Sequence, residues 1–294
     1  MTKQEDFIND PFLQDSSSAE KILTDASLVC TYDSPIILHI PHSSAFIPSE
    51  LQDQFIISPG DLEEEIRLMT DHYTDELFAG NSKDSAVIFP ISRICVDPER
   101  FRDDAQEAMS EKGMGVIYTH SSSSCAIRRA LTVTERLRLL AEYYDPHHAR
   151  LEALVSEKFK ASSRCLIIDC HSFPSKPLPY EFDQSTDRPD ICIGTDEFHT
   201  PKWLTDEGVR LFESYGFITA VNRPFSGSLV PGRHYRSNQN VFSLMIEVNR
   251  KLYLNEDTAL KSVSFGRVQE IIQEVLEPMQ KRLEAQCIQG SQIF

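Results

Sequence analysis

The sequence predicts an α/β fold in which helices cover both faces of one sheet, and two observations support this prediction. Short apolar runs recur along the chain, and amphipathic stretches with apolar residues at three- and four-residue spacing lie between them. Hydrophobic residues make up 40% of the 294 residues and charged residues 25%, which is the composition of a globular protein with a sizeable core. Strands that alternate with helices are typical of a sheet between helical layers.

Six apolar runs are the expected strands, and four amphipathic stretches are the expected helices. In chain order, the strands are SPIILHI (34–40), SAVIFPISRICV (85–96), SRCLIIDC (163–170), PDICIG (189–194), GFITAVN (216–222) and VFSLMIEV (241–248). The helices span about 61–80, 129–160, 201–215 and 258–286. In the first helix, Leu62, Ile66, Met69 and Tyr73 fall on one stripe, and Gly80 is a stop signal.

The remaining segments are expected to be an arm and two loops. Residues 1–30 are polar and acidic, and we expect them to form a loosely held arm. Residues 31–294 contain no internal repeat or linker and are expected to form one domain. Within it, SSSSC at 121–125 and the proline-rich stretch 172–189 are expected to be surface loops, which often shape a substrate cleft.

The overall charge limits the classes of partner. The formal net charge of -16 would repel nucleic acid, because phosphate binding depends on clustered Lys and Arg. A small anionic substrate is still compatible with this charge, since a few arginines inside a cleft set the local potential. We therefore expect a small-molecule substrate and no nucleic-acid partner.

The cysteines and the N-terminus predict a soluble cytoplasmic protein. The seven cysteines form no CxxC pair, and several lie in apolar runs where a thiol behaves as a small buried hydrophobe. The opening MTKQEDFIND has neither a basic nor an apolar signal region, and no apolar run reaches membrane-spanning length. A membrane partner is therefore not expected.

Two histidines follow predicted strands and suggest a metal site. ILHIPHSS ends a strand at Pro41 and delivers His42, and CLIIDCHSF delivers Asp169 and His171 in the same way. In open α/β sheets, ligands gather outside the carboxyl ends of the strands. Either histidine alone could merely cap its strand by hydrogen bonding, but two such His-Ser pairs favour a metal.

A catalytic zinc site needs three protein ligands and an open position for water, so a third donor is required. Asp71 in TDHYTDELF is our choice, with His72 and Asp75 as rivals. An acidic residue on a helix is usually only solvated surface. The residues alone therefore leave the third ligand open.

A carboxylate lies in the last apolar strand. Glu247 ends the apolar run of FSLMIEV, where burial of a charge is costly without a partner. Beside a metal, this carboxylate could take a proton from water and pass it to a leaving amine. The alternative is a structural ion pair with an arginine such as Arg250.

Two further segments carry arginines suited to an anionic substrate. SRICVDPERFRDD places Arg93 and Arg100 after a predicted strand, and the guanidinium fork can bind a carboxylate with two hydrogen bonds. NRPFSGSLVPGRHY adds Arg233 and has Gly227 at a tight turn. These basic residues could also be plain surface.

Taken in order, PHSS, TDHYTDEL, SRICVDPER, YYDPHH, DCHS, DICIGT, NRPFSG and MIEV resemble the N-formylglutamate amidohydrolase family over about residues 35–255. The resemblance implies a three-layer αβα fold with a central mixed sheet, like that of zinc carboxypeptidases and aspartoacylase. It also implies one divalent metal, most simply zinc, and hydrolysis of an N-acylated acidic amino acid, typically N-formyl-L-glutamate to formate and L-glutamate.

The resemblance also implies roles for individual residues. It implies metal ligation by His42, Asp71 and His171, a catalytic role for Glu247, and substrate binding by Arg93, Arg100, His148, Asn222 and Gly227, with Phe225 in the same turn as Asn222. From its guanidinium fork alone, Arg233 is expected to join the two arginines in binding substrate. Two positions depart from the family pattern. Asp97-Pro98-Glu99-Arg100 stands where the family often has D-x-N-R, and Ser228 follows Gly227 where a second Gly is common.

Those departures leave substrate identity open. An acid at position 99 changes the hydrogen bonding beside the arginine expected to bind substrate. Ala45 stands three residues after His42, so the H-x-x-E ligand pair of the carboxypeptidases is absent, which favours Asp71 as the third ligand. The competing hypotheses are a hydrolase for another N-acyl amino acid or small peptide-like amide, and a non-catalytic ligand-binding relative.

Overall fold

The computed structural model describes residues 34–80 and 82–290, with side chains described up to residue 285. The expected N-terminal arm, residues 1–30, lies outside the described residues. A mixed six-stranded sheet forms the centre, in the order β2-β1-β3-β6-β4-β5. Its strands are β1 (Ile36–Ile40), β2 (Ser85–Ile88), β3 (Cys165–Phe173), β4 (Ile191–Gly194), β5 (Thr219–Val221) and β6 (Val241–Asn249). β4 runs antiparallel to β6, whereas the other neighbouring strands are parallel, so the prediction of a mixed sheet is confirmed.

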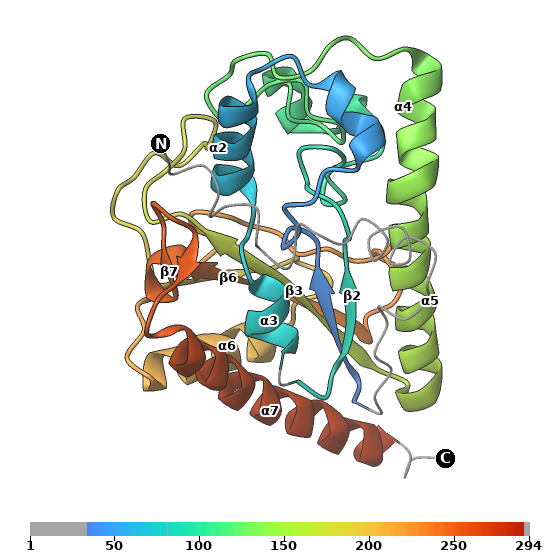
Figure 1. Ribbon diagram of the computed structural model, residues 1–294. Coiled ribbons are helices and arrows are strands. Elements are labelled where there is room, and N and C mark those ends of the chain that lie inside the picture. Colours follow the sequence, from blue (N-terminus) through green and yellow to red (C-terminus); the bar gives the residue numbers. More distant parts are fainter. Residues whose placement is uncertain (1–33, 81, 291–294) are drawn as a thin grey trace.

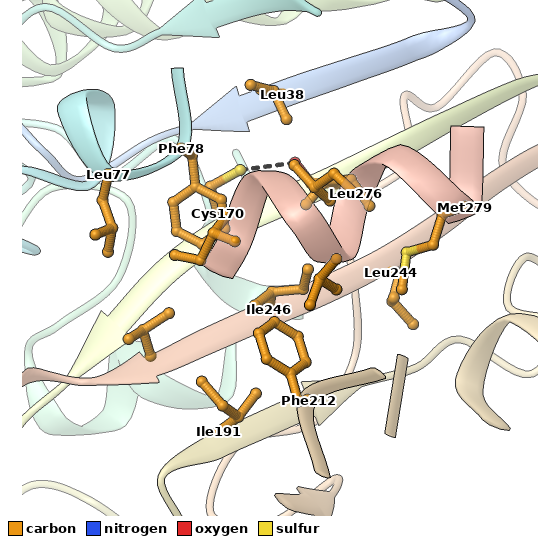
Figure 2. Close-up of a cluster of buried hydrophobic side chains, with 14 of the residues drawn as sticks. Leu38, Leu77, Phe78, Cys170, Ile191, Phe212, Leu244, Ile246, Leu276 and Met279 are labelled. Atoms are coloured by element: carbon orange, nitrogen blue, oxygen red, sulfur yellow. Dashed lines mark hydrogen bonds between the residues drawn. The ribbon is translucent and has the colours of Figure 1, made fainter. Parts of the chain in front are cut away.

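Helices cover both faces of this sheet (Figure 1). On one face, α3 (Thr74–Ala79), α6 (Lys202–Ser214) and α7 (Phe265–Gly290) pack on alternate strand residues such as Leu38, Cys170 and Ile246. Figure 2 shows these side chains meeting Phe78, Phe212 and Leu276 of the three helices. On the other face, α5 (Asp145–Ser162) packs on the intervening residues. The α/β prediction is therefore confirmed, and its cause is the two-residue period of the strands.

A second region with its own core lies at the carboxyl ends of β1, β2 and β3. It comprises η2 (Ser49–Gln54), α2 (Pro59–Met69), η3 (Asp104–Gln106), η4 (Ala108–Lys112), α4 (Val133–Leu139) and the π-helical turn η5 (Leu140–Tyr144) that joins α4 to α5. Buried residues from these elements and from the segment 89–127 form a separate cluster. This region encloses the space above the strand ends, where polar side chains gather.

The prediction of one continuous helix over 61–80 was wrong, because the structure has two helices there, α2 and α3. α2 ends at Met69, and Tyr73 adopts a left-handed conformation with φ of 61° before α3 begins. Such a backbone costs a residue with a side chain about 1–2 kcal/mol. The Asp71 carbonyl accepts hydrogen bonds from the Thr74 N–H and hydroxyl, and the Asp71 N–H donates to the His42 carbonyl over 2.9 Å. The break therefore ties Asp71 to the end of β1.

Other predicted boundaries also shifted for local reasons. The strand predicted over 85–96 ends at Ile88, because Pro90 cannot donate to a ladder. The helix predicted from 129 begins at Val133, after a capping box formed by Thr132 and Glu135. The last helix starts at Phe265, since β7 (Leu254–Asn255) and β8 (Leu260–Lys261) pair after the short η6 (Arg250–Leu252). Across the described part of the chain, no helix combines the length and apolar character needed to span a membrane.

Candidate active site

The alternation of the central strands places polar residues on one face at their carboxyl ends. Ile37, Ile167 and Val241 pack under α5 near the amino ends of β1, β3 and β6. Further along the same face of these strands come four polar residues, which are His39, Asp169, His171 and Glu247. His39 pairs in register with Asp169, and His171 pairs with Glu247. On this face of the sheet, buried apolar residues near the amino ends of the strands are therefore followed by polar site residues near the carboxyl ends.

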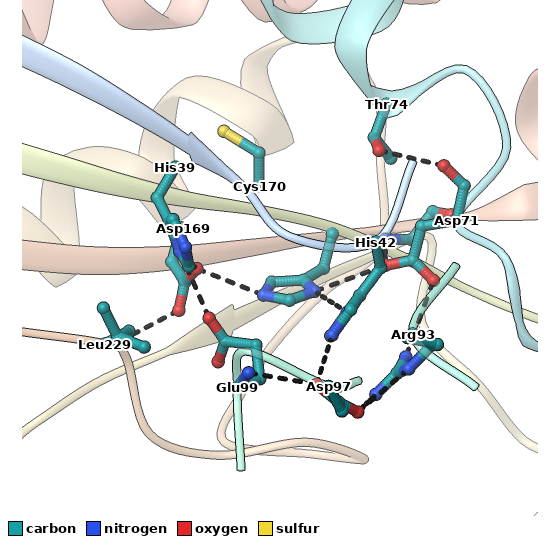
Figure 3. A network of polar contacts seen from close by, with 12 residues as sticks. His39, His42, Asp71, Thr74, Arg93, Asp97, Glu99, Asp169, Cys170 and Leu229 are labelled. Atoms are coloured by element: carbon teal, nitrogen blue, oxygen red, sulfur yellow. Dashed lines mark hydrogen bonds and ion pairs between the residues drawn. The ribbon is translucent and has the colours of Figure 1, made fainter. Parts of the chain in front are cut away.

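His42, Asp71 and His171 bring three ligand atoms together, as the sequence predicted. Figure 3 shows His42 and Asp71 within the surrounding network of polar contacts. His42 Nδ1 lies 3.3 Å from His171 Nδ1, His171 Nδ1 lies 3.2 Å from Asp71 Oδ2, and His42 Nδ1 lies 3.7 Å from the same oxygen. Ligands held about 2.0 Å from a zinc ion at the corners of a tetrahedron stand about 3.3 Å apart. The separations and the two nitrogens and one oxygen therefore fit such an ion.

Two buried aspartates hold the remote nitrogens of both histidines. His42 Nε2 lies 2.8 Å from Asp97 Oδ1, and His171 Nε2 lies 3.1 Å from Asp169 Oδ1. A carboxylate on the far nitrogen fixes the ring orientation and makes the near nitrogen a better metal ligand. The two aspartates therefore orient the Nδ1 atoms of His42 and His171 toward Asp71.

The electrostatics of the cluster suit a cation. Burial alone would raise the pKa of Asp71, but hydrogen bonds with His171 and His42 hold it well below its usual value. Burial alone would lower the pKa of His171, but the charge of Asp169 and hydrogen bonds to Asp169 and Asp71 raise it well above its usual value. Without a metal, these shifts favour a protonated His171 beside an ionised Asp71, and a metal cation bound by both side chains would replace that proton.

Glu247 lies buried beside this cluster. Burial and the negative charge of Asp71 together raise its pKa to about 8, against the opposing charge of His171. Its Oε2 atom is buried and has no hydrogen-bond partner. The alternative of an ion pair with Arg250 is not observed, because Arg250 donates instead to Asp71 Oδ1 over 2.9 Å and to the Leu68 carbonyl. Glu247 is thus a carboxyl group of raised basicity with a free oxygen.

A cavity of about 340 Å³ opens over the cluster. His42, Asp71, His171 and Glu247 line it together with Arg93, Arg100, Arg250, Glu99, Phe173 and Phe225. Arg93 donates twice to Asp97 Oδ2, over 3.1 and 2.8 Å. Arg100 Nε has no hydrogen-bond partner and lies 3.7 Å from the same oxygen. Of these arginines, Arg100 is the one least engaged by the protein.

The rival third ligands lie outside the cluster. His72 Nε2 donates to the Arg67 carbonyl over 3.0 Å, and burial lowers the pKa of His72 to about 4. Asp75 belongs to the first turn of α3 and is not among the clustered atoms. The break between α2 and α3 explains why Asp71 and not Asp75 joins the cluster. Asp71 lies in the break and faces the end of β1, whereas Asp75 lies beyond the break in α3.

Three other predicted site residues, His148, Asn222 and Gly227, lie around the cavity without lining it. His148 donates through Nε2 to the Pro98 carbonyl over 2.9 Å and so supports the segment that carries Arg100. The Asn222 amide bonds to Thr195, and Gly227, with φ of 96°, ends the turn that brings Phe225 to the cavity. The predicted role of Arg233 is not supported, because this residue lies on an exposed turn away from the cavity.

Sequence reasoning missed several buried partners. Asp97 and Asp169 were seen in their motifs but given no role, and Arg250 was considered only as a partner of Glu247. His39 was not singled out, although its position two residues after Ile37 places it on the site face. His39 Nδ1 lies 2.8 Å from Asp169 Oδ1, and its Nε2 lies 2.8 Å from His147 Nε2. The alternation of side chains along the strand could have identified His39 as a site residue from the sequence.

The comparisons with known proteins agree with this architecture. The chain is similar to the N-formylglutamate amidohydrolase from Ralstonia eutropha JMP134, with 22% identity, a TM-score of 0.74, and coverage of 87% of this chain and 96% of that one. It is also similar to a gene product of Agrobacterium tumefaciens, with 18% identity, a TM-score of 0.61, and coverage of 84% and 92%. None of the curated proteins matches the chain. The family model described as N-formylglutamate amidohydrolase matches residues 34–254, and the chain therefore belongs to the N-formylglutamate amidohydrolase family.

Proposed function

We propose that this protein is a metal-dependent amidohydrolase that cleaves the N-formyl or N-acyl amide of an amino acid, with N-formyl-L-glutamate, hydrolysed to formate and L-glutamate, as the first substrate to test. The observation that carries the proposal is the convergence of His42, Asp71 and His171 beside a buried carboxyl group with a free oxygen, Glu247. Family membership supports hydrolysis of an amide.

The three ligands would hold one divalent metal, and zinc suits two imidazoles and one carboxylate. When bound, such a metal supplies Lewis acidity to the amide carbonyl and to the attacking water. Because Asp97 and Asp169 contact the Nε2 atoms of His42 and His171, the Nδ1 atoms face Asp71 and would bind the metal.

Glu247 acts as the base in this proposal. It accepts the proton of the attacking water through a carboxylate oxygen and later delivers that proton to the leaving nitrogen. Burial raises the pKa of this carboxyl group, which makes it a stronger base than a solvent-exposed glutamate. Arg100 binds a carboxylate of the substrate, and so places the amide beside the cluster.

Several finer expectations from the sequence stay proposals. They are a fold of the zinc carboxypeptidase and aspartoacylase type, a single domain over residues 31–294, and a cytoplasmic location. Hydrolysis of another N-acyl amino acid or small peptide-like amide is the main alternative. A non-catalytic ligand-binding relative is the other, but His42, His171 and Glu247 lie together in one cavity, which favours the enzyme.

Metal content and turnover test the proposal together. Purified protein should contain about one divalent metal per chain by elemental analysis, because three converging ligands bind zinc firmly. Exhaustive chelation should abolish release of formate from N-formyl-L-glutamate, and added zinc should restore it. Full activity in protein from which all metal has been removed would end the metal hypothesis. A metal-loaded protein that hydrolyses none of a panel of N-acyl amino acids would end the enzymatic one.

A further inference from the structure

The guanidinium group of Arg100 is held only loosely by its own side-chain contacts. Its Nε atom has no hydrogen-bond partner among the described residues and lies 3.7 Å from Asp97 Oδ2. Arg93, by contrast, donates twice to the same oxygen. A long side chain binds a carboxylate with two parallel hydrogen bonds only if its main chain is correctly placed. The proposed contact with substrate therefore depends on how the Arg100 backbone is anchored.

Two side chains of the adjoining helical segment anchor that backbone. The Tyr144 hydroxyl donates to the Arg100 carbonyl over 2.9 Å, and His148 Nε2 donates to the Pro98 carbonyl over the same distance. Tyr144 and His148 are four residues apart and so lie on the same side of the helix. Their rings also pack on each other, with centroids 4.1 Å apart. One side of the helix thus holds the main chain at residues 98 and 100.

Tyr144 ends the π-helical turn η5, a kind of turn that is frequent at functional sites. Burial and the charges of Glu99 and Asp97 raise the pKa of Tyr144 to about 12, so its hydroxyl keeps the donated proton at neutral pH. The side chain is 8% exposed and is not among the residues that line the cavity. Tyr144 can therefore act on a substrate only through the segment that carries Arg100.

We propose that Tyr144 is a positioning residue, which holds the Arg100 main chain so that the guanidinium group meets the substrate carboxylate. The inference rests on the proposed amidohydrolase function and adds a residue to its substrate site. Tyr144→Phe removes the hydroxyl but keeps a ring against His148. The Arg100 carbonyl then loses this hydrogen bond, and the segment gains freedom that it must lose again when substrate binds.

Kinetics on N-formyl-L-glutamate and its two monoamides, N-formyl-L-glutamine and N-formyl-L-isoglutamine, test this role. The wild type should be poorest on the monoamide that lacks the carboxylate bound by Arg100. Tyr144→Phe should lower kcat/KM on N-formyl-L-glutamate by about fivefold to tenfold, as expected for the loss of one hydrogen bond. On the poor monoamide, the same change should have little effect, because the contact that Tyr144 positions is not made.

A neighbouring tyrosine and a double variant provide the controls. Tyr143 lies in the same turn, but its hydroxyl donates to the exposed Glu50 over 3.2 Å. Tyr143→Phe should therefore match the wild type on all three substrates. In the Arg100→Lys background, Tyr144→Phe should cause little further loss, because both changes act on one contact. Equal losses on all three substrates, or a full additional loss in the double variant, would mean that Tyr144 only stabilises the fold, and would overturn the proposal.

Binding of L-glutamate separates this inference from the proposed function. Calorimetry on metal-loaded protein needs no turnover, and Tyr144→Phe should weaken L-glutamate binding by about fivefold to tenfold, whereas Tyr143→Phe should leave it unchanged. If N-formyl-L-glutamate is not hydrolysed but this difference is observed, the hydrolase proposal fails and the role of Tyr144 stands. Hydrolysis of N-formyl-L-glutamate together with equal L-glutamate binding in the two variants would overturn the role of Tyr144 alone.

Discussion

Replacing Glu247 by Gln should stabilise the metal-free protein at alkaline pH. Burial raises the pKa of Glu247 from 4.5 to about 8, so the folded protein keeps this proton up to about pH 8. The unfolded chain loses it above about pH 4.5. Between these values the folded state binds more protons, and the free energy of unfolding therefore falls as pH rises. Gln carries no such proton, and its variant loses this part of the pH dependence.

The size of the effect follows from the same pKa. The full difference between 4.5 and about 8 corresponds to at most ~5 kcal/mol, and about 2–3 kcal/mol of it develops between pH 6 and pH 9. Urea unfolding of chelator-treated wild type and Glu247→Gln at both pH values measures it. Glu213→Gln, which changes an exposed residue of α6, serves as the control and should keep the wild-type slope. Equal losses of stability in wild type and Glu247→Gln between the two pH values would refute the assignment of the raised pKa.

The same variant separates structure from catalysis in metal-loaded protein. Gln has nearly the shape of Glu but cannot accept the proton of the attacking water. Glu247→Gln should therefore retain its metal, while kcat falls by about 10²-fold to 10⁴-fold. Elemental analysis and formate release measure the two quantities. Near-normal turnover would make Glu247 a structural residue.

Three further predictions address the ligands and the substrate clamp. His171→Ala should lose both the metal and turnover, measured as above, and a variant that keeps a full complement of metal would contradict the ligand assignment. Asp97→Asn should weaken metal affinity by about 10-fold to 100-fold in a competition titration with a chelator, since its contact with His42 Nε2 changes; unaltered affinity would contradict this role. Arg100→Lys should lower kcat/KM by about tenfold or more on a substrate with a free carboxylate, because an ammonium group cannot form the two parallel hydrogen bonds of a guanidinium group. On the matching carboxamide, kcat/KM should change little. Equal losses on both substrates would mean that Arg100 stabilises the fold or the metal site.

The strands were predictable because each is a short run of mostly apolar residues, as expected for strands buried on both faces. His42 follows the end of β1, whereas His171 and Glu247 lie within β3 and β6, two residues before the strands end. Their order in the sheet depends on contacts between distant segments, and no local pattern reveals it. The same limit applies to the registers that set His171 beside Glu247.

The helix break was not predictable from periodicity. The apolar stripe from Leu62 to Leu77 continues in phase through Thr70–Tyr73, so the pattern alone favours one continuous helix. What stops it is the hydrogen bond from the Asp71 N–H to the His42 carbonyl, a contact between residues 29 positions apart along the chain. The role of Asp97 could not be predicted for a similar reason, since its partner His42 lies 55 residues away in sequence.

The site divides its polar residues into two sets by their hydrogen bonding. Asp71, Asp97 and Asp169 each contact a histidine, and they serve as an internal scaffold. Buried atoms of Arg100 and Glu247, which line the same cavity, have no partner among the described residues. A buried polar atom left in this state costs about 1–3 kcal/mol.

That cost is concentrated where a substrate would bind rather than spread through the scaffold. A bound molecule that brings a carboxylate to Arg100 and a proton donor to Glu247 recovers interactions which the free protein lacks, without disturbing the scaffold. The attacking water is such a donor for Glu247, and the leaving nitrogen then takes the proton onward. The same unsatisfied atoms that make the empty cavity unfavourable therefore supply both the substrate affinity and the proton transfer of the proposed reaction.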